Sequence, residues 1–193
     1  MKVCLVKYPA GNVKSVEIAL KRLGITPVLT SDPDTLNKAD KLILPGVGHA
    51  GELSRFLEAE NLAELIRGFK NPVLGICLGM QIMCSASEEG NARGLGIVDG
   101  NVLKFKGELK VPQIGWNRIY NLKGPLFKNV TESAYVYYVN SFYLPVVNCT
   151  SGFSHYGTEF SAAVERDNFF GVQFHPEKSG PEGYRIITNF LSL

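Results

Sequence analysis

The chain has 193 residues, of which 45% are hydrophobic and 20% are charged, and its formal net charge at pH 7 is +2. This size and composition are typical of one globular domain, which we expect to span residues 1–193. The small net charge and the lack of a dense Lys/Arg run argue against a nucleic-acid partner. The sequence also contains no apolar run near the roughly 18 residues that cross a membrane.

Strands and helices alternate in the first half of the chain. Apolar runs predict strands over Val3–Val6, Thr26–Thr30, Lys41–Leu44 and Pro72–Ile76. Amphipathic patterns predict helices over Val13–Leu23, where Gly24 is a typical helix stop, and from about Glu52 to Phe69, with a break near Glu60 and Asn61. This alternation is typical of an α/β fold with a mostly parallel central sheet and flanking helices on both faces.

The second half is richer in short β segments. They lie between Val98 and Gln173 and are separated by Gly, Asn and Pro; the clearest are Val111–Tyr120, Tyr135–Val139 and Ser161–Glu165. We expect antiparallel hairpins that are added to the central sheet rather than a second domain. A further strand is predicted over Phe169–Phe174, and a closing helix from about Pro181 to Leu191.

The four cysteines are irregularly spaced and form no CxxC metal-binding pattern. Cys4 lies in a predicted apolar strand and Cys84 in a predicted apolar helix over Met80–Cys84, so we expect both in the core. The N-terminal segment has the pattern of a short strand and not of a long apolar signal segment. We therefore expect a cytoplasmic protein in a reducing environment.

The segment Gly75-Ile76-Cys77-Leu78-Gly79 follows an apolar run and precedes a helical stretch. A cysteine between small residues at a strand-to-helix turn is the thiol form of a nucleophile elbow. The glycines allow a sharp turn, which places the Cys77 sulfur outward at a helix N-terminus, where backbone N–H groups favour the thiolate. A buried structural cysteine is the alternative, and this segment alone does not decide between the two.

A nucleophilic thiol needs a base and a group that orients the base. Of the three histidines, His175 is the best candidate because it ends the strand predicted over Phe169–Phe174. In an extended segment Glu177 lies on the same side as His175 and can accept its N–H, and Pro176 disfavours a helix there. An isolated His-Pro-Glu segment is more often a loop, but together with a cysteine elbow it indicates a catalytic pair.

Acyl transfer also needs backbone donors that face the developing negative charge. The N–H of Leu78, directly after the cysteine, is one candidate for this oxyanion hole. A second donor could come from the glycine-rich loop Pro45–Gly48, where Val47 is the candidate. By itself this loop is typical of an ordinary strand-to-helix turn.

These segments together resemble the class I, or triad, glutamine amidotransferases. The elbow with Met80-Gln81 and the segment Phe174–Ser179 are similar, within that class, to the glutaminase subunits of imidazole glycerol phosphate synthases. Further matching segments extend over nearly the whole chain: Gly11-Asn12 with Ser15-Val16, Leu44–Gly48, Gly94–Gly96, Val111-Pro112 with Gly115–Asn117, and Asn189-Phe190.

The resemblance implies a glutaminase in which Cys77 is the nucleophile, His175 the general acid and base, and Glu177 the group that orients His175. Cys77 attacks the side-chain amide of glutamine, ammonia leaves with a proton from His175, and water hydrolyses the glutamyl thioester. Residues implied to bind the amino-acid end of glutamine are Gly46, Gly48, Gln81, Glu89, Asn140, Ser141 and Phe142. Without the resemblance, Gln81 and Glu89 are ordinary polar residues on a helix surface.

The resemblance also implies a heterodimer. In this family ammonia passes to a (β/α)8-barrel cyclase, which uses it in histidine biosynthesis, and no metal or organic cofactor is needed. Asn12, Trp116 and Lys178 are expected to face that partner; the alternative is a half-buried Trp and two solvated polar residues. We expect glutamine hydrolysis to be weak without the partner, because uncoupled turnover would waste glutamine.

Three segments differ from the common family pattern: Lys7–Ala10 in place of Asp-Tyr-Gly, Gln113-Ile114 in place of His-Met, and Asn140 in place of His. They leave open a paralogous subunit that supplies ammonia to another acceptor, such as a surface-sugar precursor. Three more functions have the same chemistry or fold: an ammonia-producing subunit for anthranilate or pyridoxal phosphate synthesis, a non-catalytic regulatory subunit and a cysteine peptidase. The Gly-Trp-Asn segment disfavours the first, the complete triad disfavours the second, and no peptide-binding cleft is indicated for the third.

Overall fold

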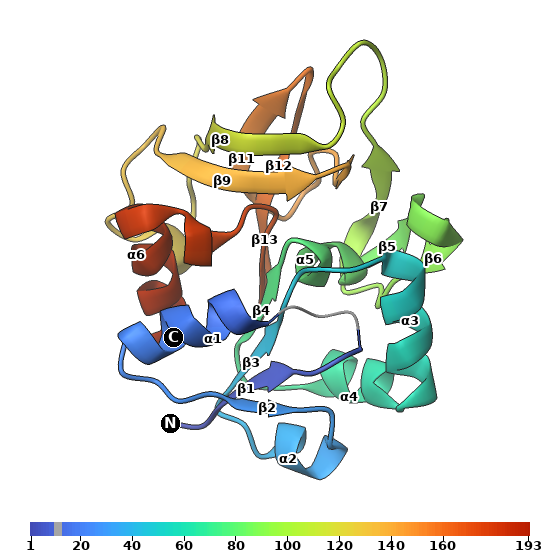
Figure 1. Ribbon diagram of the computed structural model, residues 1–193, viewed down its shortest axis with the longest axis vertical. Coiled ribbons are helices and arrows are strands. Elements are labelled where there is room, and N and C mark those ends of the chain that lie inside the picture. The colour runs from blue at the N-terminus through green and yellow to red at the C-terminus, as the bar shows by residue number, and fades with distance from the viewer. Residues whose placement is uncertain (10–12) are drawn as a thin grey trace.

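The predicted strands of the first half pair in parallel in the computed structural model, which describes residues 1–9 and 13–193. They are β1 (Val3–Val6), β2 (Val28–Thr30), β3 (Lys41–Leu44) and β4 (Val73–Ile76). β13 (Phe169–Val172) joins β4 in parallel, and β12 (Thr158–Arg166) and β11 (Thr150–Tyr156) continue the sheet antiparallel. Among the described residues, the order in this central sheet is β11-β12-β13-β4-β3-β1-β2 (Figure 1).

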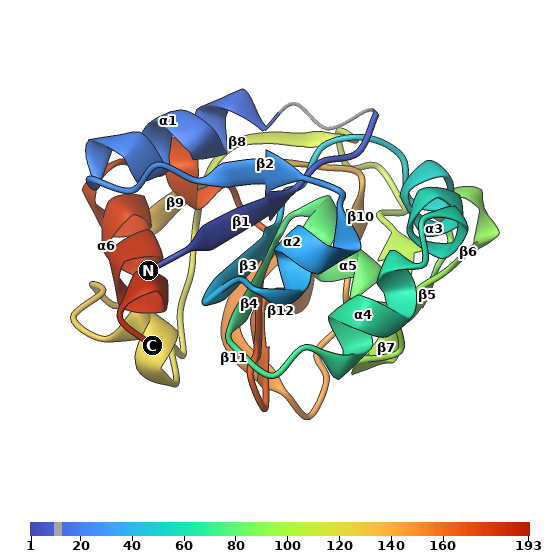
Figure 2. The same cartoon turned by 90° about the horizontal axis from the view of Figure 1, so that it is seen from below.

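Helices cover both faces of the sheet, as the alternation predicts (Figure 2). One face carries α1 (Lys14–Arg22) and α6 (Gly180–Leu191), and the other carries α2 (Pro33–Asn37), α3 (Ala50–Ala59), α4 (Leu62–Gly68) and α5 (Leu78–Ile82). Successive side chains of a strand point to opposite faces. On β1, Leu5 therefore packs with α1 and α6, whereas Cys4 packs with the helices of the other face.

The backbone confirms the predicted helix ends. Gly24 follows α1 with a φ of +79°, a left-handed conformation that glycine adopts without strain. The predicted break near Glu60 separates α3 from α4, and Asn61 has a φ of +56°. The short helix α2 is an addition to the predicted elements. The Asp32 side chain begins it by accepting the N–H of Thr35 at 2.8 Å.

The prediction that the later hairpins are added to the central sheet is only partly correct. β11 and β12 join it, but β8 (Gln113–Arg118) and β9 (Tyr135–Asn140) form a separate antiparallel ribbon. Val136 and Tyr138 on β9 are buried while Tyr135 and Val139 are exposed. This alternation lets the ribbon lie with one face on the core, above the central sheet in Figure 1, instead of pairing at a sheet edge.

A further small sheet has the order β10-β7-β5-β6. It contains β5 (Cys84–Ser87), β6 (Ala92–Arg93), β7 (Val98–Lys104) and β10 (Phe142–Tyr143). The prediction that Cys84 lies in a helix is therefore wrong, although Cys84 and Cys4 are both buried as expected. α5 ends early because the carbonyls of Ile82 and Met83 accept the N–H groups of Leu95 and Ile97 instead of continuing the helix.

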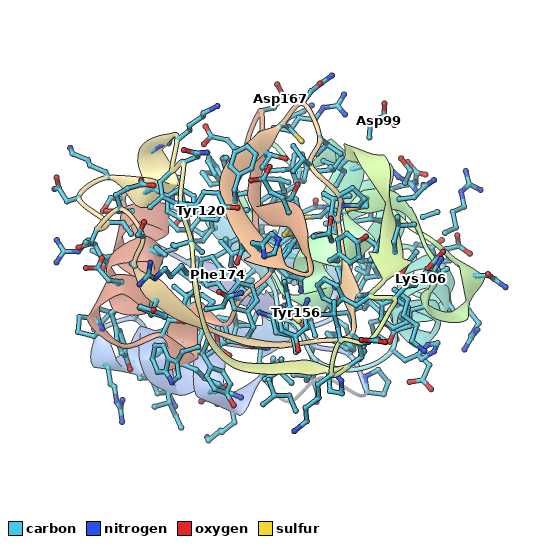
Figure 3. The ribbon with its side chains drawn as sticks, turned by 90° about the horizontal axis from the view of Figure 1, so that it is seen from above. Asp99, Lys106, Tyr120, Tyr156, Asp167 and Phe174 are labelled. Atoms are coloured by element: carbon cyan, nitrogen blue, oxygen red, sulfur yellow. The ribbon has the colours of Figure 1, made fainter. Side chains whose placement is uncertain are left out.

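Short 3₁₀ helices occur at Glu89–Asn91 (η1), Pro125–Phe127 (η2) and Pro176–Lys178 (η3). Seen from above, Phe174 lies towards the middle of the molecule, whereas Asp99 and Asp167 lie at its periphery (Figure 3). None of the helices in the described part of the chain has the length and apolarity needed to cross a lipid bilayer.

Candidate active site

Cys77 lies on a sharp turn between β4 and α5. Its φ and ψ are +50° and −107°, a combination that is strained for a residue with a side chain. The N–H of Cys77 donates to the carbonyl oxygen of Val172 on β13 at 2.7 Å, which holds the turn against the neighbouring strand. The backbone therefore turns at Cys77 as the glycine-flanked sequence predicts.

Gly75 and Gly79 are needed because backbone passes close to both of them. A Cβ atom on Gly75 would lie 2.5 Å from the carbonyl oxygen of Gly79. A Cβ atom on Gly79 would lie only 2.0 Å from the carbonyl oxygen of Leu44, at the end of β3. These distances are far below van der Waals contact, so a side chain at Gly75 would push α5 away from β4, and a side chain at Gly79 would push α5 away from β3.

His175 and Glu177 form a buried pair beside the turn. The imidazole Nδ1 lies 3.0 Å from Glu177 Oε1, and the two side chains are only 5% and 2% exposed. Ser15 on α1 donates its hydroxyl to the same carboxylate oxygen at 3.3 Å. The predicted contact is present, but the predicted extended segment is wrong. Pro176 begins η3, where a missing N–H costs nothing, and the 3₁₀ turn brings Glu177 back to the imidazole.

Opposing effects act on the pKa of His175. Burial by itself lowers this pKa, but hydrogen bonds to Cys77 and Glu177, together with their negative charges, raise it overall to about 10. The imidazole is therefore protonated at neutral pH. A protonated imidazole in contact with a cysteine sulfur favours the thiolate and can later give its proton to a leaving group.

Two buried amides lie behind the sulfur of Cys77. Gln173 Nε2 lies 3.5 Å from Sγ, and Gln173 Oε1 accepts a hydrogen bond from Gln81 Nε2 at 2.9 Å. On another side, the carbonyl oxygen of Val139 lies 3.8 Å from Sγ. The sulfur is therefore held by the residues around it, and the exposed fraction of Cys77 is 7%.

The loop Pro45–Gly48 lies next to Cys77, but its Val47 N–H is already engaged. It donates to the hydroxyl of Tyr8 at 3.1 Å. The same hydroxyl lies 2.9 Å from the Pro45 carbonyl oxygen and 2.5 Å from the Val47 carbonyl oxygen, both of which can accept its proton. Of the two predicted oxyanion donors, Val47 is thus turned towards Tyr8 in this structure.

The predicted site residues converge on one pocket of about 330 Å³. It lies where β3 and β4 end, beside the end of the β8–β9 ribbon. Its walls are formed by Gly46, Val47, Gly48, Cys77, Leu78, Gln81, Glu89, Pro112, Val139, Asn140, Ser141, Phe142, His175 and Lys178. Every residue predicted from the sequence to bind glutamine is among them, and Glu177 lies behind His175.

Glu89 and Asn140, like Gln81, also have hydrogen bonds to other parts of the chain. Glu89 accepts the N–H of Ala50 at 2.8 Å and so stabilises the start of α3. Asn140 donates from Nδ2 to the carbonyl oxygen of Phe142 at 2.9 Å. Its buried Oδ1 has no hydrogen-bond partner among the described residues, which leaves one acceptor available to a ligand.

Two of the residues predicted to face a partner contact the same ring: Lys178 Nζ lies 6.0 Å from the centre of the Tyr137 ring, and the Trp116 ring lies 5.9 Å from it. Lys178 is on the pocket wall, and Trp116 is on the exposed face of the β8–β9 ribbon with 55% of its surface accessible. Asn12 lies outside the described residues. Within residues 1–9 and 13–193, no cluster of three or more His, Cys, Asp or Glu side chains is arranged to hold a metal ion.

Sequence reasoning missed Tyr8 and Gln173. The signal for Gln173 is its position two residues before His175, because residues two apart in a strand share a face. The signal for Tyr8 is weaker: it follows β1, and β1 pairs with β3, which leads into the Pro45–Gly48 loop. Neither signal indicates the atom that each side chain contacts.

Comparisons with known proteins agree with this geometry. Residues 10–193 match the family model described as glutamine amidotransferase class-I. Similar full-length proteins carry the name imidazole glycerol phosphate synthase subunit HisH, and two of them serve as examples. The one from Bacteroides thetaiotaomicron is 52% identical and the one from Yersinia pseudotuberculosis 43% identical, and each alignment covers 100% of both chains.

Solved structures show the same fold at lower sequence identity. A crystal structure of a glutamine amidotransferase has a TM-score of 0.75 and 18% identity, and covers 98% of this chain and 97% of that one. The structure of PurLQS from Thermotoga maritima has a TM-score of 0.74 and 19% identity, with 99% and 97% coverage. The chain therefore belongs to the class I glutamine amidotransferase family and, within it, groups with the HisH subunits of imidazole glycerol phosphate synthase.

Proposed function

We propose that this chain is a glutaminase subunit that releases ammonia from glutamine and passes it to a cyclase partner in histidine biosynthesis. The observation that carries the proposal is the strained Cys77 turn beside the buried His175–Glu177 pair, at the wall of a pocket large enough for an amino acid. The names of the full-length relatives support the histidine pathway. A biosynthetic subunit of this kind would work in the cytoplasm, within a heterodimer.

In the proposed reaction the Cys77 thiolate attacks the side-chain carbonyl carbon of glutamine. The negative charge that develops on the carbonyl oxygen is met by the N–H groups of Leu78 and Val47. His175 gives its proton to the departing nitrogen, so that ammonia leaves and a glutamyl thioester remains on Cys77. Neutral His175 then takes a proton from water, the resulting hydroxide attacks the thioester, and glutamate and the thiolate are regenerated.

The remaining pocket residues are proposed to hold the amino-acid end of glutamine. Glu89 and the free Oδ1 of Asn140 are acceptors suited to the α-ammonium group. Backbone of Gly46, Gly48, Ser141 and Phe142 and the side chain of Gln81 complete the walls. An ammonium and a carboxylate at fixed positions would select a free amino acid and reject an internal glutamine of a peptide.

The contact between Tyr8 and Val47 supports the proposal that hydrolysis is weak without the partner. While the Val47 N–H donates to Tyr8, it does not face the site of charge development. One such donor typically changes kcat by about 100-fold to 1,000-fold. Partner binding would therefore activate the subunit if it turned the Gly46–Val47 peptide towards Cys77.

The exposed face of the β8–β9 ribbon is the proposed docking surface for a (β/α)8-barrel cyclase. Four large apolar side chains are exposed on it: Ile114 (62%), Trp116 (55%), Tyr135 (52%) and Val139 (37%). Cross-strand pairing places Ile114 opposite Val139 and Trp116 opposite Tyr137, on one face of the ribbon. Val139 also lines the pocket, so a partner on this face would adjoin the place where ammonia is released.

The test is glutamate release from glutamine by the purified chain, alone and with an imidazole glycerol phosphate synthase cyclase and its nucleotide ligand. We expect slow release alone and strong stimulation by the liganded cyclase, with no release by Cys77→Ala in either case. Cys77-dependent release without stimulation would retain the glutaminase and point to a paralogous acceptor. No release in any mixture would contradict the proposed chemistry.

A further inference from the structure

The side-chain amide of Gln173 contacts the sulfur of Cys77. Gln173 directly follows β13, is completely buried, and places Nε2 3.5 Å from Sγ. The glutaminase reaction proposed for Cys77 and His175 gives this residue no role. A buried polar side chain directed at a reacting atom, with no task in the triad, therefore needs an explanation.

A backbone carbonyl fixes the direction of the Gln173 amide. Gln81 Nε2 lies 3.0 Å from the Phe142 carbonyl oxygen, which can only accept, so Gln81 presents its NH2 group there. The second hydrogen of that NH2 group is directed at Gln173 Oε1, 2.9 Å away, which must therefore be the oxygen. The NH2 group of Gln173 is left facing Sγ as a donor.

The carbonyl oxygen of Val139 also lies near the Cys77 sulfur, and its effect on a thiolate is opposite to that of the Gln173 NH2 group. This oxygen lies 3.8 Å from Sγ, where it can accept from a neutral thiol but repels a thiolate. Donors have the opposite preference, since a hydrogen bond to an ionised group is stronger than one to its neutral form. Gln173 also differs from His175 in that an amide does not titrate, so its donation is the same at every pH.

We propose that Gln173 is a positioning residue that stabilises Cys77 as a thiolate and holds its sulfur for attack, with Gln81 locking the Gln173 amide in place. This rests on the proposed function only in taking Cys77 as the nucleophile. Gln81 lines the pocket and Gln173 lies behind it, so a molecule bound against Gln81 is connected to the sulfur through two amides.

The titratable and charged groups around the sulfur set the background for a test. His175 contacts it from the start of η3, with Glu177 behind the imidazole. The Tyr8 hydroxyl is hydrogen-bonded to the backbone of the Pro45–Gly48 loop beside Cys77. Glu89 and Lys178 line the same pocket. None of these groups is hydrogen-bonded to the side chain of Gln173, whose partners are Gln81 and Sγ.

The experiment measures how fast iodoacetamide alkylates Cys77 between pH 5 and pH 10, with the modified peptide identified by mass spectrometry. Gln173→Met keeps the length of the side chain and removes its N–H groups. We expect the midpoint of the profile to rise by about one pH unit, and alkylation at a pH below both midpoints to slow about tenfold. Gln113→Met is the matched control, because Gln113 is also buried but, on β8 opposite Asn140, makes no hydrogen bond to Gln81, Gln173 or Sγ.

A second variant keeps the test valid if Gln173→Met does not fold. Gln81→Met leaves the Gln173 amide in place but removes its anchor, so we expect a smaller rise of the same midpoint. An unchanged midpoint in either folded variant, or an equal rise in Gln113→Met, would overturn the proposal. The alkylation profile is measured without glutamine and without the partner. A failure of glutamate release would therefore count against the proposed function and not against the proposed role of Gln173.

Discussion

Glu177 supplies the negative charge that helps to keep His175 protonated. In Glu177→Gln an acceptor for Nδ1–H remains but the charge is lost, so the pKa of His175 should fall from about 10. A histidine whose pKa is raised by folding adds stability that is complete below its unfolded pKa of about 6.5 and disappears as pH rises towards 10. The variant should therefore lose more unfolding free energy at about pH 6 than at about pH 9.5.

Urea unfolding at the two pH values measures this loss. We expect the loss to be larger at the lower pH by about 1 kcal/mol or more. Glu64→Gln on the surface of α4 is the control, because Glu64 pairs with Arg67 and not with a histidine. Equal losses at both pH values would mean that Glu177 does not set the pKa of His175.

Tyr8 gives a prediction of the opposite kind, in which removing one hydroxyl raises activity. Tyr8→Phe keeps the buried ring and frees the Val47 N–H from its acceptor. We expect kcat for glutamine hydrolysis by the chain alone to increase at least about tenfold, which is part of what one oxyanion donor supplies. Tyr184→Phe, whose hydroxyl contacts Arg22 on α1, should leave kcat unchanged. An unchanged or lower kcat in a folded Tyr8→Phe would contradict this prediction.

The Cys77 turn depends on close packing between elements. Gly79→Ala would place a methyl group 2.0 Å from the Leu44 carbonyl oxygen, so β3 and α5 would have to separate. We expect a loss of about 1–3 kcal/mol of unfolding free energy, measured in urea, together with loss of glutamate release. Gly68→Ala at the end of α4 is the control, since no described atom beyond its chain neighbours and the backbone of its own helix lies within 4 Å of the added methyl group. Comparable stability of Gly79→Ala and Gly68→Ala would refute the packing argument.

Much of the parallel sheet could be predicted because its strands are buried on both faces. Lys41–Leu44 and Val3–Val6 are short apolar runs, and the structure has strands with those bounds. The placement of β8 and β9 could not be predicted, because one hydrophobic alternation suits both a sheet edge and a ribbon lying on the core. α2 has a helix-start signal at Asp32 and Pro33, but Pro33–Asn37 is too short to show a periodic pattern.

The parts of the candidate site that could be predicted are those whose residues lie close together in the sequence. The elbow needs small residues around Cys77, and the His175–Glu177 contact needs two residues close in sequence. Tyr8 and Val47 are 39 positions apart, and Gln173 and Cys77 are 96 apart, so their contacts depend on tertiary structure. The sequence also could not indicate which way the Val47 N–H points, because a peptide beside glycines can adopt either direction.

At the scale of the whole molecule, the exposed apolar face of the β8–β9 ribbon predicts where the cyclase docks. Trp116→Ala should weaken the complex about tenfold or more, because aromatic anchors dominate such interfaces. Glutamine hydrolysis by the chain alone should not change, since Trp116 is not part of the pocket wall. Leu29→Ala is the control, because Leu29 is also an exposed apolar residue but lies on β2, an edge strand of the central sheet. Titration of each variant with cyclase gives its affinity for the partner and, before cyclase is added, its rate of glutamine hydrolysis. Equal affinities of Trp116→Ala and Leu29→Ala would exclude this face.

Transfer of nitrogen from glutamine to the cyclase product tests the central claim most directly. Glutamine labelled with ¹⁵N in its side-chain amide would be given to the chain and its liganded cyclase in the presence of excess unlabelled ammonium. We predict that the imidazole product carries ¹⁵N with the wild-type chain and carries only unlabelled nitrogen with Cys77→Ala. Unlabelled product with the wild-type chain, or labelled product with Cys77→Ala, would contradict the account.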